Sequence, residues 1–238
     1  MKLLIIDSTN GAKTLINSVK HINTTDYKLV KLEIAKLLVF NKNNMRDHIS
    51  ELLFNNLTNN YDICIIMCVS ASSSILDILI KNNFVIANVL IIEPILPICL
   101  YIKKRKFKTL LILSSSLTQK IRWFSRILNS NTNSNTNSNT NSNTNSNTNN
   151  VTIKYATLKL SENEMTNNVK ISAGVNNLIN YKAFIGKCDG ILLGCSSYSL
   201  IKNIIAKELK SKYNYQGELL DSSIITFEYL SSFISQHI

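Results

Sequence analysis

Short apolar runs alternate with segments of helical periodicity along most of the chain, and this alternation limits the fold more than any other feature. The runs are continuous and end in polar residues, as strands buried on both faces of a parallel sheet do. Between the runs, apolar residues recur at helical spacing, as at Ile75, Leu76 and Leu79. Such alternation predicts an α/β fold with parallel sheets. The predicted strands are residues 3–6, 63–67, 89–92, 110–113, 152–156, 191–193 and 218–220.

One segment, residues 84–102, is apolar over a length close to that of a membrane span. Glu93 lies inside it, and a carboxylate at the centre of a bilayer costs about 3 kcal/mol. Pro94 and Pro97 also divide the segment, because proline does not continue a helix from the preceding residue. We therefore predict a buried strand followed by a helix, and no membrane association.

The composition limits the class of protein. The chain has 238 residues and five cysteines, an odd number without any Cys-x-x-Cys pair, so a secreted disulfide framework is not expected. We expect reduced thiols and a cytoplasmic protein. The first apolar run is too short for a signal peptide. Three histidines occur, none near a cysteine in the sequence, so no metal site is expected.

The chain is basic, with a formal net charge of +11 and a pI of about 9.4. The charge is spread along the sequence except in residues 103–108, which contain five lysines and arginines. A basic run at the C-terminal end of a helix is favoured by the helix dipole, so we expect no specific nucleic-acid site. Nonspecific, salt-sensitive binding of nucleic acid is the alternative.

Residues 129–150 repeat asparagine, serine and threonine, with no apolar residue. Such a segment buries nothing to offset the entropy lost on ordering, so we predict a disordered insertion. The rest of the chain has the length of two small α/β lobes.

Polar residues follow four of the predicted strands. Because the carboxyl ends of parallel strands meet at one edge of a sheet, where ligands bind, these residues form a candidate site. Hydroxyl and backbone N–H groups at helix N-termini bind carboxylates, although helix capping alone explains any single cluster. The four clusters are Asp7 with Ser8, Cys68 with Ser70, Ser115 with Thr118, and Cys195 with Ser196.

Cys68 and Cys195 have matching settings, each between a strand-like run and the start of a helical segment. A helix N-terminus lowers the pKa of a thiol, so we expect two reactive thiols that face one pocket. Buried packing is the alternative for any cysteine, and it is what we expect for Cys64, Cys99 and Cys188.

On these residues the sequence resembles the glutamate racemase family, within the cofactor-independent aspartate/glutamate racemases. The similarity covers nearly the whole chain in the family's order, and the second cysteine phrase is its most specific part. The phrases are Ile6-Asp7-Ser8, Cys68-Val69-Ser70-Ala71-Ser72, Ile91-Ile92-Glu93-Pro94, Leu193-Gly194-Cys195-Ser196-Ser197-Tyr198 and Asp221-Ser222.

The resemblance implies two parallel-sheet α/β lobes with the active site in the cleft between them. It places the first lobe at residues 1–93 and 207–238, and the second at 94–206. It also implies roles for individual residues. Cys68, Cys195 and Asp7 would be catalytic, and the substrate would be bound by Ser8, Ser70, Ser115, Thr118 and Ser196.

The implied function is conversion of L-glutamate to D-glutamate by two cysteines, without a cofactor, for synthesis of a cell-wall (peptidoglycan) precursor. The partner is then a small amino acid, and the oligomeric state, monomer or homodimer, stays open. The sequence departs from the family's pattern at Thr9 (glycine), Val69 (asparagine), Ser197 (histidine) and Ser199 (proline). These departures leave two alternatives: a racemase of aspartate or another amino acid, and a catalytically impaired relative that binds a carboxylate.

Overall fold

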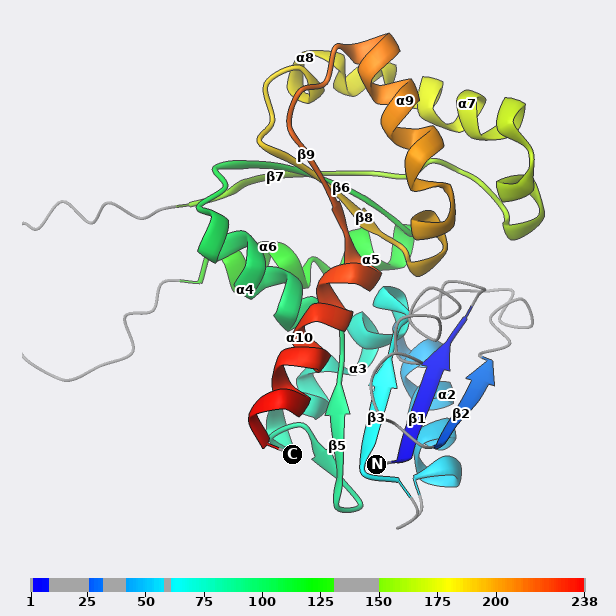
Figure 1. The fold of residues 1–238 in the computed structure, drawn as a ribbon, viewed down its shortest axis with the longest axis vertical. Coiled ribbons are helices and arrows are strands. Elements are labelled where there is room, and N and C mark those ends of the chain that lie inside the picture. The colour runs from blue at the N-terminus through cyan, green and yellow to red at the C-terminus, as the bar shows by residue number, and fades with distance from the viewer. Residues whose placement is uncertain (1, 9–25, 32–41, 58–60, 131–149, 238) are drawn as a thin grey trace, which may run out of the picture.

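The structure is a computed structural model that describes residues 2–8, 26–31, 42–57, 61–130 and 150–237. It contains two stacked α/β lobes, each built on its own sheet (Figure 1). The first sheet has the strand order β2-β1-β3-β5-β4, parallel except for β4. Its strands are β1 (Lys2–Asp7), β2 (Asp26–Lys31), β3 (Ile63–Ile66), β4 (Val85–Ile86) and β5 (Val89–Ile92).

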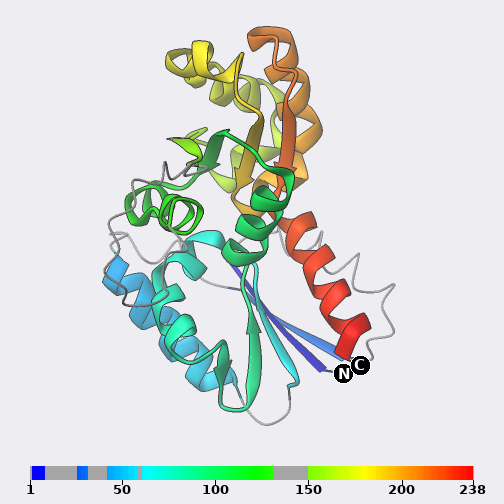
Figure 2. The same ribbon diagram turned by 90° about the vertical axis from the view of Figure 1, so that its left-hand side faces the viewer.

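Helices cover both faces of the first sheet, as Figure 2 shows from the side. Leu4 and Ile6 of β1 pack in one apolar cluster with α2 (Lys42–Asn56) and α3 (Val69–Lys81). Leu3 and Ile5 point to the other face, where they pack with Leu230 of α10 (Ser222–His237). Because successive side chains of a strand alternate between faces, a sheet covered on both sides requires the continuous apolar runs seen in the sequence.

The second sheet is parallel throughout, in the order β7-β6-β8-β9. Leu110 and Ile112 pack on one face with α4 and α6, and Leu111 and Leu113 pack on the other with α7, α8 and α9. The elements are α4 (Ile95–Arg105), β6 (Thr109–Ser114), α5 (Ser116–Ile121), α6 (Trp123–Leu128), β7 (Thr152–Ala156), η2 (Glu162–Thr166), α7 (Asn168–Asn176), η3 (Asn177–Tyr181), α8 (Lys182–Ile185), β8 (Gly190–Gly194), η4 (Ser196–Ile201), α9 (Lys202–Tyr213) and β9 (Glu218–Asp221).

The last part of the chain divides between the lobes differently from the expectation for residues 207–238. β9 lies in the second sheet, because its register with β8 joins Gly190 to Glu218 and Leu193 to Asp221. Only α10 returns to the first lobe, and it brings the C-terminus close to the N-terminus (Figure 1). Which sheet a strand joins depends on pairing between distant segments, so the local pattern did not place β9.

All seven predicted strands are present, each within one residue of its predicted bounds. β2 and β4 were not predicted: β2 contains three charged residues and no continuous apolar run of more than two, and β4 has only two residues. Between β6 and the insertion, α5 and α6 are separate helices because Arg122, which lies between them, is in the left-handed region (φ 58°).

The apolar segment 84–102 folds as predicted, into β5 and the start of α4. Within the described residues, none of the helices has the length and apolar character needed to span a bilayer. Residues 131–149 of the predicted insertion lie outside the described residues. At its two ends, the side chain of Asn129 donates to the carbonyl of Val151 (3.1 Å) and accepts from its N–H (2.8 Å). This pair of bonds closes the base of the insertion between α6 and β7.

Candidate active site

Cys68 lies at the carboxyl end of β3 and is the residue that precedes α3. Its side chain is buried, and the Ser8 hydroxyl, from the end of β1, donates to its sulfur at 3.1 Å. Burial and the charge of Asp7 raise the pKa of the Cys68 thiol to about 12, against the opposing hydrogen bond from Ser8. The sequence predicted a lowered pKa from the helix N-terminus, and desolvation outweighs that effect.

Cys195 has the corresponding place in the second lobe, between β8 and the 3₁₀ helix η4. It is partly exposed, and its sulfur lies 3.0 Å from the hydroxyl oxygen of Ser197. Burial raises the pKa of this thiol too, while hydrogen bonds from Ser197 lower it and Asp7 raises it. Here again the prediction of a lowered pKa is wrong, for the same reason.

Both cysteines line a single cavity of about 330 Å³ between the two lobes. The cavity lies at the carboxyl ends of strands from both sheets, where ligands bind in α/β proteins. Its lining residues are Ser8, Cys68, Val69, Ser70, Ser115, Ser116, Leu117, Thr157, Lys159, Leu160, Met165, Cys195, Ser196 and Tyr198.

Asp7 lies behind the cavity, fully buried at the end of β1. Its carboxylate accepts a hydrogen bond from the Ser196 hydroxyl at 2.9 Å, which links the first lobe to the second. Asp7 raises the pKa of Cys68 and of Cys195, so one carboxylate acts on both thiols. It is the group that would stabilise a positive charge near either sulfur.

Three hydroxyl groups form a triangle beside Cys68. The oxygens of Ser70 and Ser115 are 2.6 Å apart, and each lies close to that of Thr118, at 3.3 Å and 3.2 Å. Ser115 also caps α5 by accepting from the N–H of Thr118. Ser70 and Ser115 line the cavity, whereas Thr118 is buried behind them. Hydroxyls that both donate and accept in this way can bind a carboxylate oxygen at the cavity surface.

The positions that depart from the family's pattern have defined places. Val69 lines the cavity without offering a hydrogen bond. Ser197 contacts the sulfur of Cys195, and Ser199 donates to the Asp221 carboxylate at 2.6 Å. Thr9 lies outside the described residues. Glu93 is absent from the cavity lining and caps α4 by accepting from the backbone N–H groups of the helix's first two residues.

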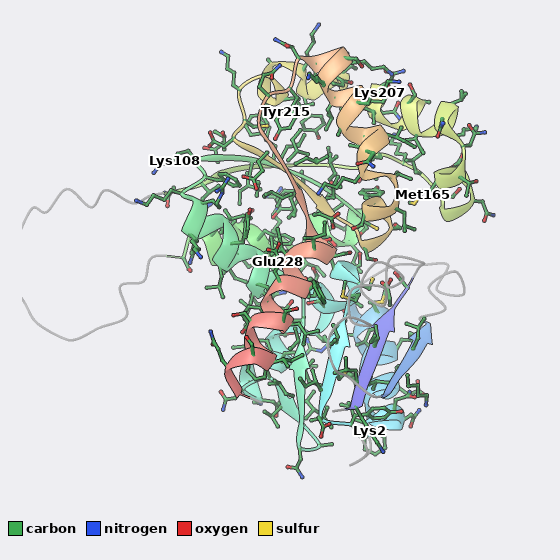
Figure 3. The ribbon with its side chains drawn as sticks, viewed as in Figure 1. Lys2, Lys108, Met165, Lys207, Tyr215 and Glu228 are labelled. Carbon is green, nitrogen blue, oxygen red and sulfur yellow. The ribbon has the colours of Figure 1, made fainter. Side chains whose placement is uncertain are left out.

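Several lining residues were not predicted from the sequence. Thr157 and Lys159 follow β7, a strand that was predicted, so the rule for polar residues applied at the other four strand ends would have found them, whereas the apolar Leu160 does not fit that rule. Tyr198 was part of the quoted cysteine phrase but received no role. Met165, labelled in Figure 3, comes from η2 of the second lobe and has no sequence signal, since a lone methionine fits any core.

The remaining cysteines, Cys64, Cys99 and Cys188, are buried in apolar clusters, as predicted. All five cysteines are free thiols. In the part of the chain that the structure describes, no group of three His, Cys, Asp or Glu side chains could hold a metal ion.

The two-lobed architecture is similar to that of several solved racemases. Similar solved structures are glutamate racemases. That from Bacillus anthracis has a TM-score of 0.75 at 14% identity, over 98% of this chain and 81% of that one. The glutamate racemase from Aquifex pyrophilus has a TM-score of 0.69 at 22% identity, and the match covers 98% of this chain and 84% of that one. The glutamate racemase from Francisella tularensis, in complex with D-glutamate, has a TM-score of 0.71 at 16% identity, and the match covers 99% of this chain and 81% of that one.

An aspartate racemase from Picrophilus torridus and an allantoin racemase from Pseudomonas fluorescens also match, with lower TM-scores of 0.55 and 0.57. No protein-family model and no curated protein matches the sequence. The chain therefore has the glutamate racemase fold, at a sequence identity that shows the fold alone.

Proposed function

We propose that the protein racemises glutamate, with Cys68 and Cys195 as the two acid–base groups. The observation that carries the proposal is that the two thiols, one from each lobe, line the same cavity. Inversion of an amino acid requires removal of the α-hydrogen from one face of the carbon and delivery of a proton to the other. Two thiols that reach one cavity from different lobes can meet that requirement, which a single group does not.

The proposed reaction conserves protons and charge. A thiolate at Cys68 takes the α-proton, and the electron pair left on carbon delocalises into the substrate carboxylate. The thiol of Cys195 then gives its proton to the opposite face and becomes the thiolate. The reverse direction exchanges the two roles. The hydroxyls of Ser8, Ser70, Ser115 and Ser196, with Thr118 behind them, would hold the substrate and stabilise the charge that develops on its carboxylate.

Ionisation of one thiol is the first requirement of this mechanism. Burial and Asp7 raise the pKa of both thiols, so both are protonated in the empty site at neutral pH. The ammonium group of a bound amino acid would lie among these groups and favour a thiolate, because an opposite charge nearby stabilises the ionised form. Asp7, fixed by Ser196, would hold that ammonium or orient a thiol.

Glutamate is the proposed substrate because similar structures include a glutamate racemase solved with D-glutamate. The test is NMR of the α-proton in deuterated water, with L- and D-glutamate and with both enantiomers of aspartate. Exchange of both glutamate enantiomers that is faster than exchange of aspartate supports the proposal. Exchange of aspartate alone would instead assign the activity of an aspartate racemase.

A second candidate is a relative that binds a carboxylate without turnover. It is favoured by Val69, which adds an apolar side chain to the cavity wall, and by the raised pKa of both thiols. Calorimetric binding of an acidic amino acid, with no isotope exchange over the pH range in which the thiols ionise, would support this candidate over the racemase.

A further inference from the structure

Lys159 is the one charged residue in the lining of the cavity, within the residues that the structure describes. The other lining groups are thiols, hydroxyls and apolar side chains, and the buried carboxylate of Asp7 lies behind them. Among the described lining residues, a second carboxylate of a substrate would therefore find its one cationic partner in Lys159.

The backbone at Lys159 is held by contacts on both sides. The Thr157 hydroxyl donates to the carbonyl of Ser114 at 2.9 Å and so fixes the end of β7 to β6. Leu158 is fully buried, and its carbonyl lies so close to Gly174 of α7 that a Cβ there would be 2.8 Å away. Lys159 itself is in the left-handed region (φ 53°), which a non-glycine residue keeps only when its surroundings determine it.

In contrast to the backbone, the side chain of Lys159 is not held by neighbouring described residues. It is exposed, and it makes no hydrogen bond or ion pair with any other described residue. Some lysines of the second lobe are paired, as Lys170 is with Glu164 and Lys212 with Glu208, whereas Lys159 combines an exposed side chain with a place in the cavity lining. A fixed backbone with an unpaired ammonium at the cavity wall is the arrangement of a residue that binds a charged ligand group.

We propose that Lys159 is a specificity-determining residue that binds the side-chain carboxylate of a dicarboxylic amino acid. The proposal rests on the proposed function, since it names the part of the same cavity that selects the substrate. The apolar wall formed by Val69, Leu117, Leu160 and Met165 suits the methylene groups between the two carboxylates. The hydroxyls near Cys68 would remain for the α-carboxylate.

The test compares the native protein with Lys159→Met, which keeps the apolar stem, and Lys159→Arg, which keeps the charge. Calorimetry measures binding of D-glutamate and of D-glutamine, a neutral analogue of nearly the same shape. Lys159→Met should weaken the binding of D-glutamate about tenfold, which corresponds to about 1.4 kcal/mol, and leave the binding of D-glutamine unchanged. Lys159→Arg should retain most of the affinity for D-glutamate.

The matched control is Lys187→Met. Lys187 is an exposed lysine before the amino end of β8, whereas the cavity lies at the carboxyl end of that strand, so this change should alter neither affinity. High salt should weaken D-glutamate binding to the native protein and have little effect on Lys159→Met. Equal losses for both ligands, or no loss for D-glutamate, would overturn the proposal.

Turnover separates this inference from the proposed function. With exchange of glutamate as the readout, Lys159→Met should raise KM and leave kcat nearly unchanged, because the lysine does not touch the α-carbon. A native protein that binds D-glutamate through Lys159 but exchanges no α-proton would refute the racemase and keep the inference. A native protein that binds neither D-glutamate nor glutarate would refute the inference directly.

Discussion

The two thiols follow similar sequence phrases but are supported in different ways. Cys68 precedes a regular helix of 13 residues, is 5% exposed, and accepts a hydrogen bond from Ser8, 60 residues earlier in the chain. Cys195 precedes a short 3₁₀ helix, is partly exposed, and contacts Ser197, two residues later. The first thiol depends on tertiary contacts, whereas the polar partner of the second comes from its own segment.

This difference shows why a strand end followed by a helix does not by itself make a reactive thiol. A helix N-terminus is worth about 0.3–1 kcal/mol to a nearby negative charge. Complete burial shifts a pKa by several units, and each unit corresponds to about 1.4 kcal/mol. Desolvation therefore dominates at Cys68 over the hydrogen bond from Ser8, and a bound positive charge would further favour its thiolate.

The largest expected effect comes from removing either sulfur. Cys68→Ala and Cys195→Ala should each lower racemisation of glutamate by about 1000-fold, because each removes the acid–base group of one face. Circular dichroism of the product solution measures the change. If either variant kept full activity, the two thiols would not be an equivalent pair and the mechanism would be wrong.

Asp7→Asn tests the group that acts on both thiols. Removal of the charge should lower the pKa of Cys68 and of Cys195 together, because Asp7 raises both. The pH profile of alkylation by iodoacetamide, followed for each cysteine by mass spectrometry, should move to lower pH for both. Turnover should fall about 100-fold. A shift confined to one cysteine would show that Asp7 serves only that lobe.

Ser8→Ala and Ser197→Ala form a matched pair that separates the two lobes. Ser8 lowers the pKa of Cys68 and Ser197 that of Cys195, so each change should slow alkylation of its own cysteine only. One hydrogen bond is worth about 1 kcal/mol, so the expected effect is about fivefold. The exposed Ser116→Ala, on the same cavity, is the control and should alter neither rate.

A separate effect, on stability and not on activity, is expected at alkaline pH. The folded pKa of Cys68 is raised from 9.0 to about 12, so its thiol stays protonated in the native state after the unfolded chain has lost the proton. The contribution of the protonated Cys68 thiol to the free energy of unfolding is complete below pH 9.0 and is lost as the pH rises to about 12.

Urea unfolding from pH 9 to 11 should therefore show a shallower fall in the free energy of unfolding for Cys68→Ala than for the native protein, by at most about 1.4 kcal/mol per pH unit. The variant also leaves a small void, which lowers stability at every pH and does not change the slope. An identical slope in both proteins would mean that Cys68 ionises equally in the folded and unfolded states.

Sequence patterns located seven of the nine described strands and six of the fourteen residues that line the cavity, because these positions depend on residues close together in the chain. The runs at β3 and β8 are short, apolar and followed by cysteine, so each strand end could be read directly. The polar lining residues after β7 follow the same rule. Met165 and the break at Arg122 do not, because neighbours from elsewhere in the fold determine both positions.

The sequence by itself determined an α/β fold with parallel strands and placed the two thiols at strand ends, because the alternation of apolar runs with helical segments is a local property that survives in any arrangement of the elements. The tertiary structure alone decided that β9 joins the second sheet, that Asp7 acts on both thiols, and that their pKa values rise. Desolvation and Coulomb interactions depend on which distant residues surround a group, and only the folded chain brings those residues together.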